Sequence, residues 1–443
     1  MQTLKNAWRV AELKNKILFT LLILVVYRLG STIPVPFVSP DLVNSVDMAG
    51  TIFEYMNFLS GQAFTTGTLF ALSVYPYITS SIVMQLLTIA IPYLERLSKE
   101  GEEGKKKIAS YTRWVTVILA LITAFGYTQL LKTGFGTGTS YLTNDTWFAQ
   151  LVIIVCYCAG ASLIMWLAER INEHGIGNGV SMILFANIIS RLPALLGSVW
   201  AMVFTDGAFG GFSWVGLILA IVSIALTLAI VVLVVWFTES ERRIPVQYAK
   251  RQVGRKMYGG QTSHLPLKMN MAGVMPIIFA SSIVSIPATI AGFFSGSPFA
   301  EWVDKWLGVN SWIYLAIYVV LILLFSYFYI MISFNPVEVS NNIRNQGGAV
   351  PGIRPGKPTA EYVARILRRI TTIGAIFLIF IAAFPMIVNN ISVIVAEKTA
   401  NDIIFSGLAF GGTSLLIVVG VALETFRTLE AQLSMRNYKG FLD

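Results

Sequence analysis

The chain has 443 residues, of which 55% are hydrophobic and only 12% are charged, and its mean hydropathy is +0.70. Soluble domains carry about 25% charged residues, so this composition excludes a soluble globular protein and indicates an integral membrane protein. The formal net charge is +9, from 32 Lys and Arg against 23 Asp and Glu.

The first apolar stretch, 17–30, follows the basic residues Lys5, Arg9, Lys14 and Lys16. It lacks a small-residue cleavage site and continues directly into STIPVPF. A cleavable signal peptide would have such a site. The pattern therefore predicts a permanent first span.

The next apolar stretch is interrupted. Residues 53–77 read FEYMNFLSGQAFTTGTLFALSVYPY, in which Gly61, Gly67 and Pro76 break the run and several Ser, Gln and Thr side chains make it half polar. An anchor that faces lipid needs none of these breaks. The stretch raises the question of what a broken, half-polar segment does in a bilayer.

A membrane span needs about 20 apolar residues. By that criterion the sequence predicts an all-α polytopic membrane protein with ten transmembrane helices, at 17–36, 64–92, 111–131, 148–168, 179–199, 213–237, 269–293, 311–334, 370–388 and 403–426. The external loop 200–212 divides them into two groups of five. Because five is odd, the second half is inverted relative to the first, which is typical of inverted repeats around a central path.

The basic residues orient the spans. Nearly all of the 32 Lys and Arg side chains fall on one side of the predicted bundle, together with both termini, and only Lys132, Arg191, Lys305 and Lys398 fall on the other. Cytoplasmic loops carry the excess of Lys and Arg. We therefore expect both termini in the cytoplasm, and a basic cytoplasmic face that suits anionic lipid and acidic partners.

Two spans carry an unusual number of small polar side chains. Span two contains Thr79, Ser80 and Gln85 beside Pro76, and the seventh stretch contains Asn270, Ser281 and Ser282 with two prolines. Helix packing in membranes also uses such residues. Their combination with proline equally indicates helices that border protein or a watery cavity.

Ionisable groups are scarce inside the predicted membrane region. Spans two, four, six, seven, eight and nine contain no Asp, Glu, Lys, Arg or His, and the two histidines, His174 and His264, fall in loops. An ion-coupled solute transporter with inverted repeats, the alternative function, needs such a group at mid-membrane. An intramembrane enzyme needs catalytic side chains. We predict no catalytic residue, no metal and no cofactor, and a motor, if needed, on another chain.

Two predicted cytoplasmic loops are long and basic, at 238–268 and 335–369. The first alternates apolar and charged residues and turns at Gly254, beside Arg255 and Lys256, which favours a projecting hairpin. The second holds Arg354 between two Pro-Gly turns. Framing one cation so rigidly costs conformational freedom, which favours docking to RNA phosphates or to an acidic protein groove over a plain basic loop.

Five motifs then resemble one family along the whole chain: GIGNG (175–179), QYAKRQ (247–252), HLPLKMNMAGVMPIIFASS (264–282), VPGIRPG (350–356) and FGGTSLLIVVG (410–420). They are similar to the SecY/Sec61α protein-translocation channels of bacterial type, as is the C-terminal NYKGFL. The resemblance implies a non-enzymatic channel that passes unfolded polypeptides across the membrane. It implies a clamshell of two halves, 1–200 and 201–427, with a cytoplasmic tail 428–443.

The resemblance also implies site residues. A plug half-helix at 51–66 would close the external funnel through Phe53, Tyr55, Met56, Phe58, Leu59, Ser60, Gly61 and Phe64. The pore ring would consist of Val74, Ile78, Val180, Leu184, Ile278 and Ile417, which departs from an all-isoleucine ring at three positions. A ring of flexible aliphatic side chains fits around a chain and blocks ions by dewetting.

Spans two and seven would form a lateral gate toward lipid, with Thr79, Ser80, Gln85, Asn270, Ser281, Ser282 and Ile286 along it. Thr79 and Ile286 are expected at neighbouring depths. The basic tips Arg255, Lys256 and Arg354 would contact the ribosome with its nascent chain or the SecA ATPase. The other implied partners are SecE, probably SecG, signal sequences and preproteins, in a bacterial plasma (inner) membrane.

Overall fold

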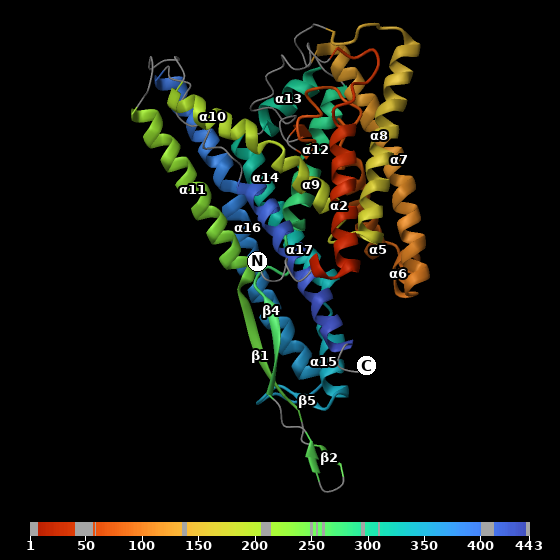
Figure 1. Ribbon diagram of the computed structural model, residues 1–443, viewed down its shortest axis with the longest axis vertical. Coiled ribbons are helices and arrows are strands. Elements are labelled where there is room, and N and C mark those ends of the chain that lie inside the picture. Colours follow the sequence, from red (N-terminus) through yellow and green to blue (C-terminus); the bar gives the residue numbers. More distant parts are fainter. Residues whose placement is uncertain are drawn as a thin grey trace.

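The computed structural model describes residues 8–39, 56–57, 59–134, 140–204, 214–248, 251–253, 256–258, 262–293, 297–308, 311–399 and 412–439. Figure 1 shows long helices that run roughly along the molecule and a set of β-strands that project from one end.

The helices of the first half are α2 (Ala11–Gly30), α5 (Tyr75–Ala90), α6 (Pro92–Lys99), α7 (Glu102–Thr133), α8 (Trp147–His174), α9 (Gly179–Ile189) and α10 (Leu192–Phe204). Those of the second half are α11 (Trp214–Glu239), α12 (Met275–Phe293), α13 (Pro298–Leu307), α14 (Trp312–Ser333), α15 (Pro336–Asn345), α16 (Lys357–Thr399) and α17 (Gly412–Lys439). Each of the ten predicted spans overlaps a described helix or, at 179–199, the pair α9 and α10.

Membrane-length helices are fewer than ten by length and composition alone. Among the described residues, five helices are long and apolar enough to cross a membrane, or six if the bent pair α5 and α6 is one span. The shorter apolar helices include Gly179–Ala194 and Met275–Pro287. Helices this short cross a bilayer only together with neighbouring segments, because about 20 residues are needed.

The predicted span 64–92 is wrong at its start. The chain runs through turns from residue 60 to 74, and helix α5 begins only at Tyr75. Backbone φ angles of +62° at Gly61, +76° at Gln62 and +60° at Gly67 are incompatible with a right-handed helix. The plug half-helix expected at 51–66 is correspondingly mostly turns in its described part, with only residues 56, 57 and 59 helical.

The end of this span is also bent. Helices α5 and α6 meet at an angle of 100° at Ile91, which is extended. Pro92 causes the bend, since proline pushes the preceding residue out of the helical region. Helix α6 buries Leu94 and Leu97 and exposes its charged face, so it forms an amphipathic turn beyond the span.

Several predicted boundaries fall inside helices. Position 200, the expected division between the halves, lies within α10, and the tail 428–443 is helical up to Lys439. The loop 335–369 contains α15, which Asn335 caps by accepting from the backbone N–H of Val337 and Glu338. It also contains the first turns of α16, a helix of 43 residues. Turn residues marked these loops, but they do not exclude short helices between the turns.

The expected hairpin is present at 238–268. Strand β1 (Glu241–Tyr248) pairs antiparallel with β4 (Thr262–Lys268) and, through Gln247 and Tyr248, with β5 (Gly348–Ala349). At the tip, β2 (Arg251–Val253) pairs with β3 (Lys256–Tyr258). The sheet packs on the start of α16 through Ile244, Leu267, Val363 and Leu367, all buried, so the extension is a packed unit.

Candidate functional site

The six predicted ring residues meet in one apolar cluster. Five of them are at most 5% exposed, namely Val74, Ile78, Leu184, Ile278 and Ile417. The sixth, Val180, is half-buried and packs against the same cluster. They come from the α5 N-cap and first turn, α9, α12 and α17. We call these six residues the collar. Four segments far apart in sequence therefore contribute aliphatic side chains to the same buried cluster.

Helices of both halves contribute to the collar. Helix α9 of the first half packs against α17 of the second, and α5 and α7 pack against α12. The collar thus lies where the two halves meet on two sides.

The motif GIGNG places the collar residues of α9. Asn178 caps the helix by accepting from the N–H of Val180 and Ser181, and Gly177 has φ of +78°. At Gly179 a Cβ atom would lie 2.0 Å from the carbonyl oxygen of Ala168, so only glycine fits there. The turn therefore brings α9 against α8 in a fixed orientation.

The segment from Leu59 to Ser73 folds against the collar, and we call it the cap segment. Leu59 is 1% exposed and belongs to the same apolar cluster as the collar. Two tyrosines from neighbouring helices bond the segment. Tyr127 of α7 donates to the carbonyl of Phe64, and Tyr157 of α8 donates to the carbonyl of Gly67 at 3.1 Å. Sequence analysis missed both, because tyrosines in an apolar span look like ordinary packing.

The predicted plug residues divide between two clusters. Leu59 faces the collar, whereas Met56 and Phe64 pack with Tyr127 and other residues between α7 and α8. Ser60 is fully buried and donates to the carbonyl of Asn57. Gly61 lies in the turn with φ of +62°, and the other predicted positions, Phe53, Tyr55 and Phe58, lie outside the described residues.

The seam between α5 and α12 is polar at one level. Ser285 Oγ donates to the hydroxyl of Tyr75 at 3.1 Å, and that hydroxyl lies 3.4 Å from the carbonyl oxygen of Ser282. Sequence analysis named Ser282 but not Tyr75 or Ser285. Both missed residues stood within the polar stretches already noted, so only the contact was hidden.

Other predicted gate residues form bonds within their own helix. Thr79 donates to the Tyr75 carbonyl, and Gln85 donates to Ser81. Because α5 begins at Tyr75, Thr79 lies one turn into the helix, and the half-buried Ile286 directly follows Ser285. The expected proximity of Thr79 and Ile286 stays a prediction.

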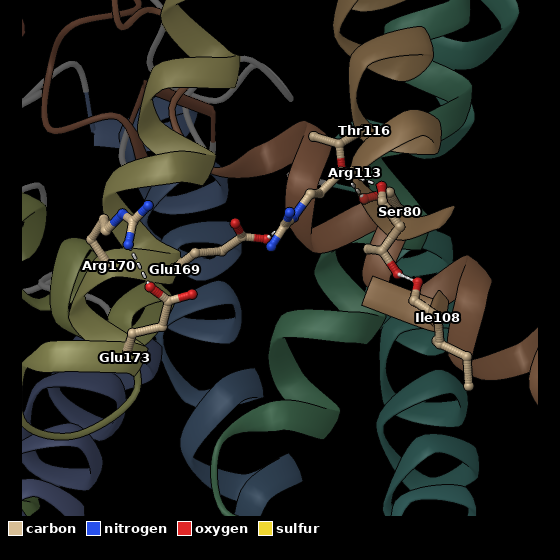
Figure 2. A network of polar contacts seen from close by, with 8 residues as sticks. Ser80, Ile108, Arg113, Thr116, Glu169, Arg170 and Glu173 are labelled. Atoms are coloured by element: carbon tan, nitrogen blue, oxygen red, sulfur yellow. Dashed lines mark hydrogen bonds and ion pairs between the residues drawn. The ribbon is translucent and has the colours of Figure 1, made fainter. Parts of the chain in front are cut away.

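Ser80, Asn270 and Ser281 have other described contacts. Ser80 Oγ shares a hydrogen bond with Thr116 Oγ1 of α7 at 2.5 Å (Figure 2). Asn270 precedes α12 and lines a cavity at the strand-bearing end. Ser281 donates to carbonyls of its own helix.

An ion pair joins α7 to α8 beside the Ser80–Thr116 contact. Arg113 Nε donates to Glu169 Oε1 at 2.8 Å, and Arg170 pairs with Glu173 one turn further along α8 (Figure 2). Figure 2 shows Arg113 between the Ser80–Thr116 contact and the α8 carboxylates. These contacts join helices of the first half to one another, so that half is held together beside the seam.

A cavity of about 510 Å³ opens at the strand-bearing end. Its lining includes Val274 and Leu416, which belong to the same apolar cluster as the collar, and the charged Lys268, Glu424 and Arg427. Arg427 pairs with Glu239 at 2.8 Å. Burial lowers the pKa of Lys268 from its ordinary value, with Arg427 adding to the effect. The cavity is thus lined by both charged and apolar side chains.

The loop around Arg354 is rigidly framed. Gly352 and Gly356 adopt φ of +79° and +101°, Thr359 donates to the Arg354 carbonyl at 2.8 Å, and Ser340 donates to the Gly356 carbonyl at 2.7 Å. The Arg354 side chain is exposed. Of the other predicted tip residues, Arg255 lies outside the described residues, and Lys256 pairs with Val253 at the end of the hairpin.

Among the described residues, no group of three or more His, Cys, Asp or Glu is placed to hold a metal ion. Long apolar helices in two halves that share one buried aliphatic cluster define a polytopic membrane protein. The SecY family model matches residues 68–426. The chain belongs to the SecY family of protein translocase channel subunits.

Relatives and solved structures agree with this assignment. The chain is 42% identical to the protein translocase subunit SecY of Streptomyces galbus, over 99% of this chain and 98% of the relative. A structure of a SecY protein whose plug domain stabilises the closed channel matches with TM-score 0.62 and 18% identity, covering 94% of this chain and 92% of that one. Sec61 in the canine ribosome-channel complex matches with TM-score 0.64 and 17% identity, at the same coverage.

These comparisons settle the class of protein. The ten-span clamshell expected from the sequence is the fold of these channels. The chain is a protein-conducting channel subunit and not an enzyme. The alternative, an ion-coupled solute transporter, is excluded.

Proposed function

We propose that this chain forms the pore by which unfolded polypeptides cross a bacterial plasma membrane, and that the collar is its constriction. The placement of the six aliphatic side chains, from four segments, in one apolar cluster supports this proposal. An aliphatic ring closes around chains of varied shape because its contacts are non-directional. It also holds back ions, since a narrow apolar passage dewets.

The cap segment is the plug in this proposal. Its Leu59 belongs to the same apolar cluster as the collar. Tyr127 of α7 and Tyr157 of α8 donate hydrogen bonds to backbone carbonyls of the segment. Backbone bonds do not depend on a regular helix, so the segment can leave and return without a change of fold. The SecY structure whose plug domain maintains a membrane seal supports this role.

The seam between α5 and α12 is the lateral gate. Its described polar contacts across the helices are those of Tyr75 with Ser282 and Ser285, so few bonds oppose its opening. An apolar signal sequence replaces those contacts with its own apolar surface. Apolar segments of a chain in transit would then pass from the collar into lipid.

The strand-bearing end is the cytoplasmic docking face. Its hairpin projects from the helices (Figure 1) and packs on the start of α16, and Ser340 helps to frame the loop that carries Arg354. Both termini lie in the cytoplasm, as the basic residues require. The partners are the translating ribosome, the SecA ATPase, preproteins with signal sequences, SecE and SecG subunits, and anionic lipid. The canine ribosome-channel complex supports the first.

A crosslink across the seam tests the lateral gate. We expect Tyr75→Cys with Ser285→Cys, in a variant in which serine replaces the free Cys156 and Cys158, to react with a short bifunctional maleimide. The tyrosine ring separates the two helices, so a direct disulfide is too short. The locked channel should lose insertion of membrane proteins, measured with a radiolabelled signal-anchor substrate.

A long flexible crosslinker at the same two positions should leave most insertion intact, because it permits opening. The matched control is a pair of cysteines in place of Arg113 and Glu169. The Arg113 Nε and Glu169 Oε1 atoms lie 2.8 Å apart, and the pair joins α7 to α8 within one half. That crosslink should not affect insertion. Normal insertion by the locked Tyr75–Ser285 channel would show that apolar segments leave by another route.

A further inference from the structure

One buried amide connects the cap segment to the helices of the collar. Asn187, in α9, has no exposed surface. Its Nδ2 donates to the Leu59 carbonyl at 2.6 Å and to the Tyr27 hydroxyl at 2.8 Å, and lies 3.4 Å from Ser73 Oγ. One side chain therefore joins α2, α9 and both ends of the cap segment.

The Leu59 carbonyl needs this donor. In a continuous helix it would accept from the N–H of Ala63, but that N–H instead donates to the Ser60 carbonyl. The positive φ values of Gly61 and Gln62 break the helix at this point. Side chains supply the missing donors: Asn187 at 2.6 Å and the Ser73 hydroxyl at 3.0 Å.

The cap segment also fits tightly over the amide. A Cβ atom at Gly61 would lie 3.1 Å from Asn187 Oδ1 and 2.9 Å from Arg28 Nη1, and Gly61 has φ of +62°. Only glycine allows the chain to approach this closely. Asn187 follows Leu184 of the collar by three residues, so the two side chains lie on one face of α9.

We propose that Asn187 is a positioning residue that latches the cap segment in its resting place through the Leu59 carbonyl. The hydrogen bond from Asn187 to the Leu59 carbonyl must break before the segment moves. The bond from Asn187 to Tyr27 of α2 can stay in place. This inference rests on the plug role proposed above. It explains why a polar amide stands one turn from an aliphatic collar, where an apolar residue would pack without needing partners.

Release of the latch is measurable in two ways. Asn187→Leu keeps the approximate size of the side chain and removes its donor. We expect resting ion conductance in planar bilayers to rise about tenfold, the ratio that corresponds to one buried hydrogen bond. We also expect Ala63→Cys, 2% exposed in the cap segment, to react about tenfold faster with a membrane-impermeant maleimide, by the same reasoning.

Two controls separate a latch from general loosening, in a background without Cys156 and Cys158. Thr128→Val removes a buried hydroxyl that bonds only its own helix, to the Ala124 carbonyl, and should change neither readout. Ala375→Cys, 1% exposed in α16 of the second half, should stay unreactive in the Asn187→Leu channel. Equal acceleration at Ala63→Cys and Ala375→Cys would reduce Asn187 to a structural role and overturn the latch.

Failure of the latch and failure of the plug give different results. If deletion of residues 55–64 raises resting conductance but Asn187→Leu leaves both readouts at wild-type values, the latch is refuted and the plug stands. If the deletion itself changes nothing, the plug proposal fails. Should Asn187→Leu not fold, Ser73→Ala removes the second donor to the same carbonyl and should act in the same direction; wild-type behaviour of that variant counts against the latch.

Discussion

Deletion of residues 55–64 is expected to turn a sealed channel into a leaking one. The deleted stretch includes Leu59, which covers the collar, and Ser60 and Gly61, which shape the turn. A closed state favoured by a few kcal/mol leaves about 0.1–10% of channels open. Deleting the segment that favours the closed state should therefore raise resting conductance about tenfold to a thousandfold. Single-channel recording of the purified complex, without ribosome or motor, measures this directly.

A point variant in the same segment is the control for this deletion. Gln62 is exposed and has φ of +76°, a conformation that asparagine tolerates, so Gln62→Asn should keep both the turn and the seal. Its conductance should match that of the wild type. Unchanged conductance in the deletion variant would mean that the collar alone seals the channel, and the plug assignment would be withdrawn.

Arg354→Glu is expected to abolish translocation driven by the SecA motor while the protein still folds and inserts. Arg354 is exposed on a loop that Ser340 and Thr359 hold in place, so the change alters charge and leaves the frame intact. An arginine at the centre of an interface is worth 2 kcal/mol or more, so translocation should fall about 30-fold or further. Protease protection of a preprotein in inverted vesicles measures it.

Two variants sharpen this result. Arg354→Lys keeps the charge but not the planar, bidentate donor, and should restore only part of the rate. Lys107→Glu reverses an exposed charge on α7, away from the framed loop, and should translocate normally. Normal translocation by Arg354→Glu would show that the framed cation is not a docking residue.

The sequence predicted the spans well because lipid contact requires long apolar runs, and these are visible without a structure. It predicted the collar only through resemblance. Val74 and Ile417 look like ordinary core residues, and their meeting depends on how α5 and α17 pack. The glycine and the charge pattern predicted a hairpin with its tip near residue 254. The structure pairs Val253 with Lys256 on either side of that position.

Three features escaped prediction for physical reasons. The start of α5 at Tyr75 depends on positive φ at Gly61, Gln62 and Gly67, and glutamine gives no signal of that conformation. The extension of α16 back to Lys357 follows its packing against the sheet, which is a tertiary effect. The contacts of Asn187 and Tyr75 join residues that lie more than a hundred positions apart in sequence.

Photocrosslinking of a stalled preprotein tests the central claim most directly. A photoreactive amino acid at Ile78, Leu184 or Ile278 of the collar should crosslink to a polypeptide arrested in transit. The same residue at Val232, which is 66% exposed on α11, should not. Crosslinks from all three collar positions and none from Val232 are the predicted result. Absence of crosslinks from the collar, or equal yields at Val232, would contradict the account.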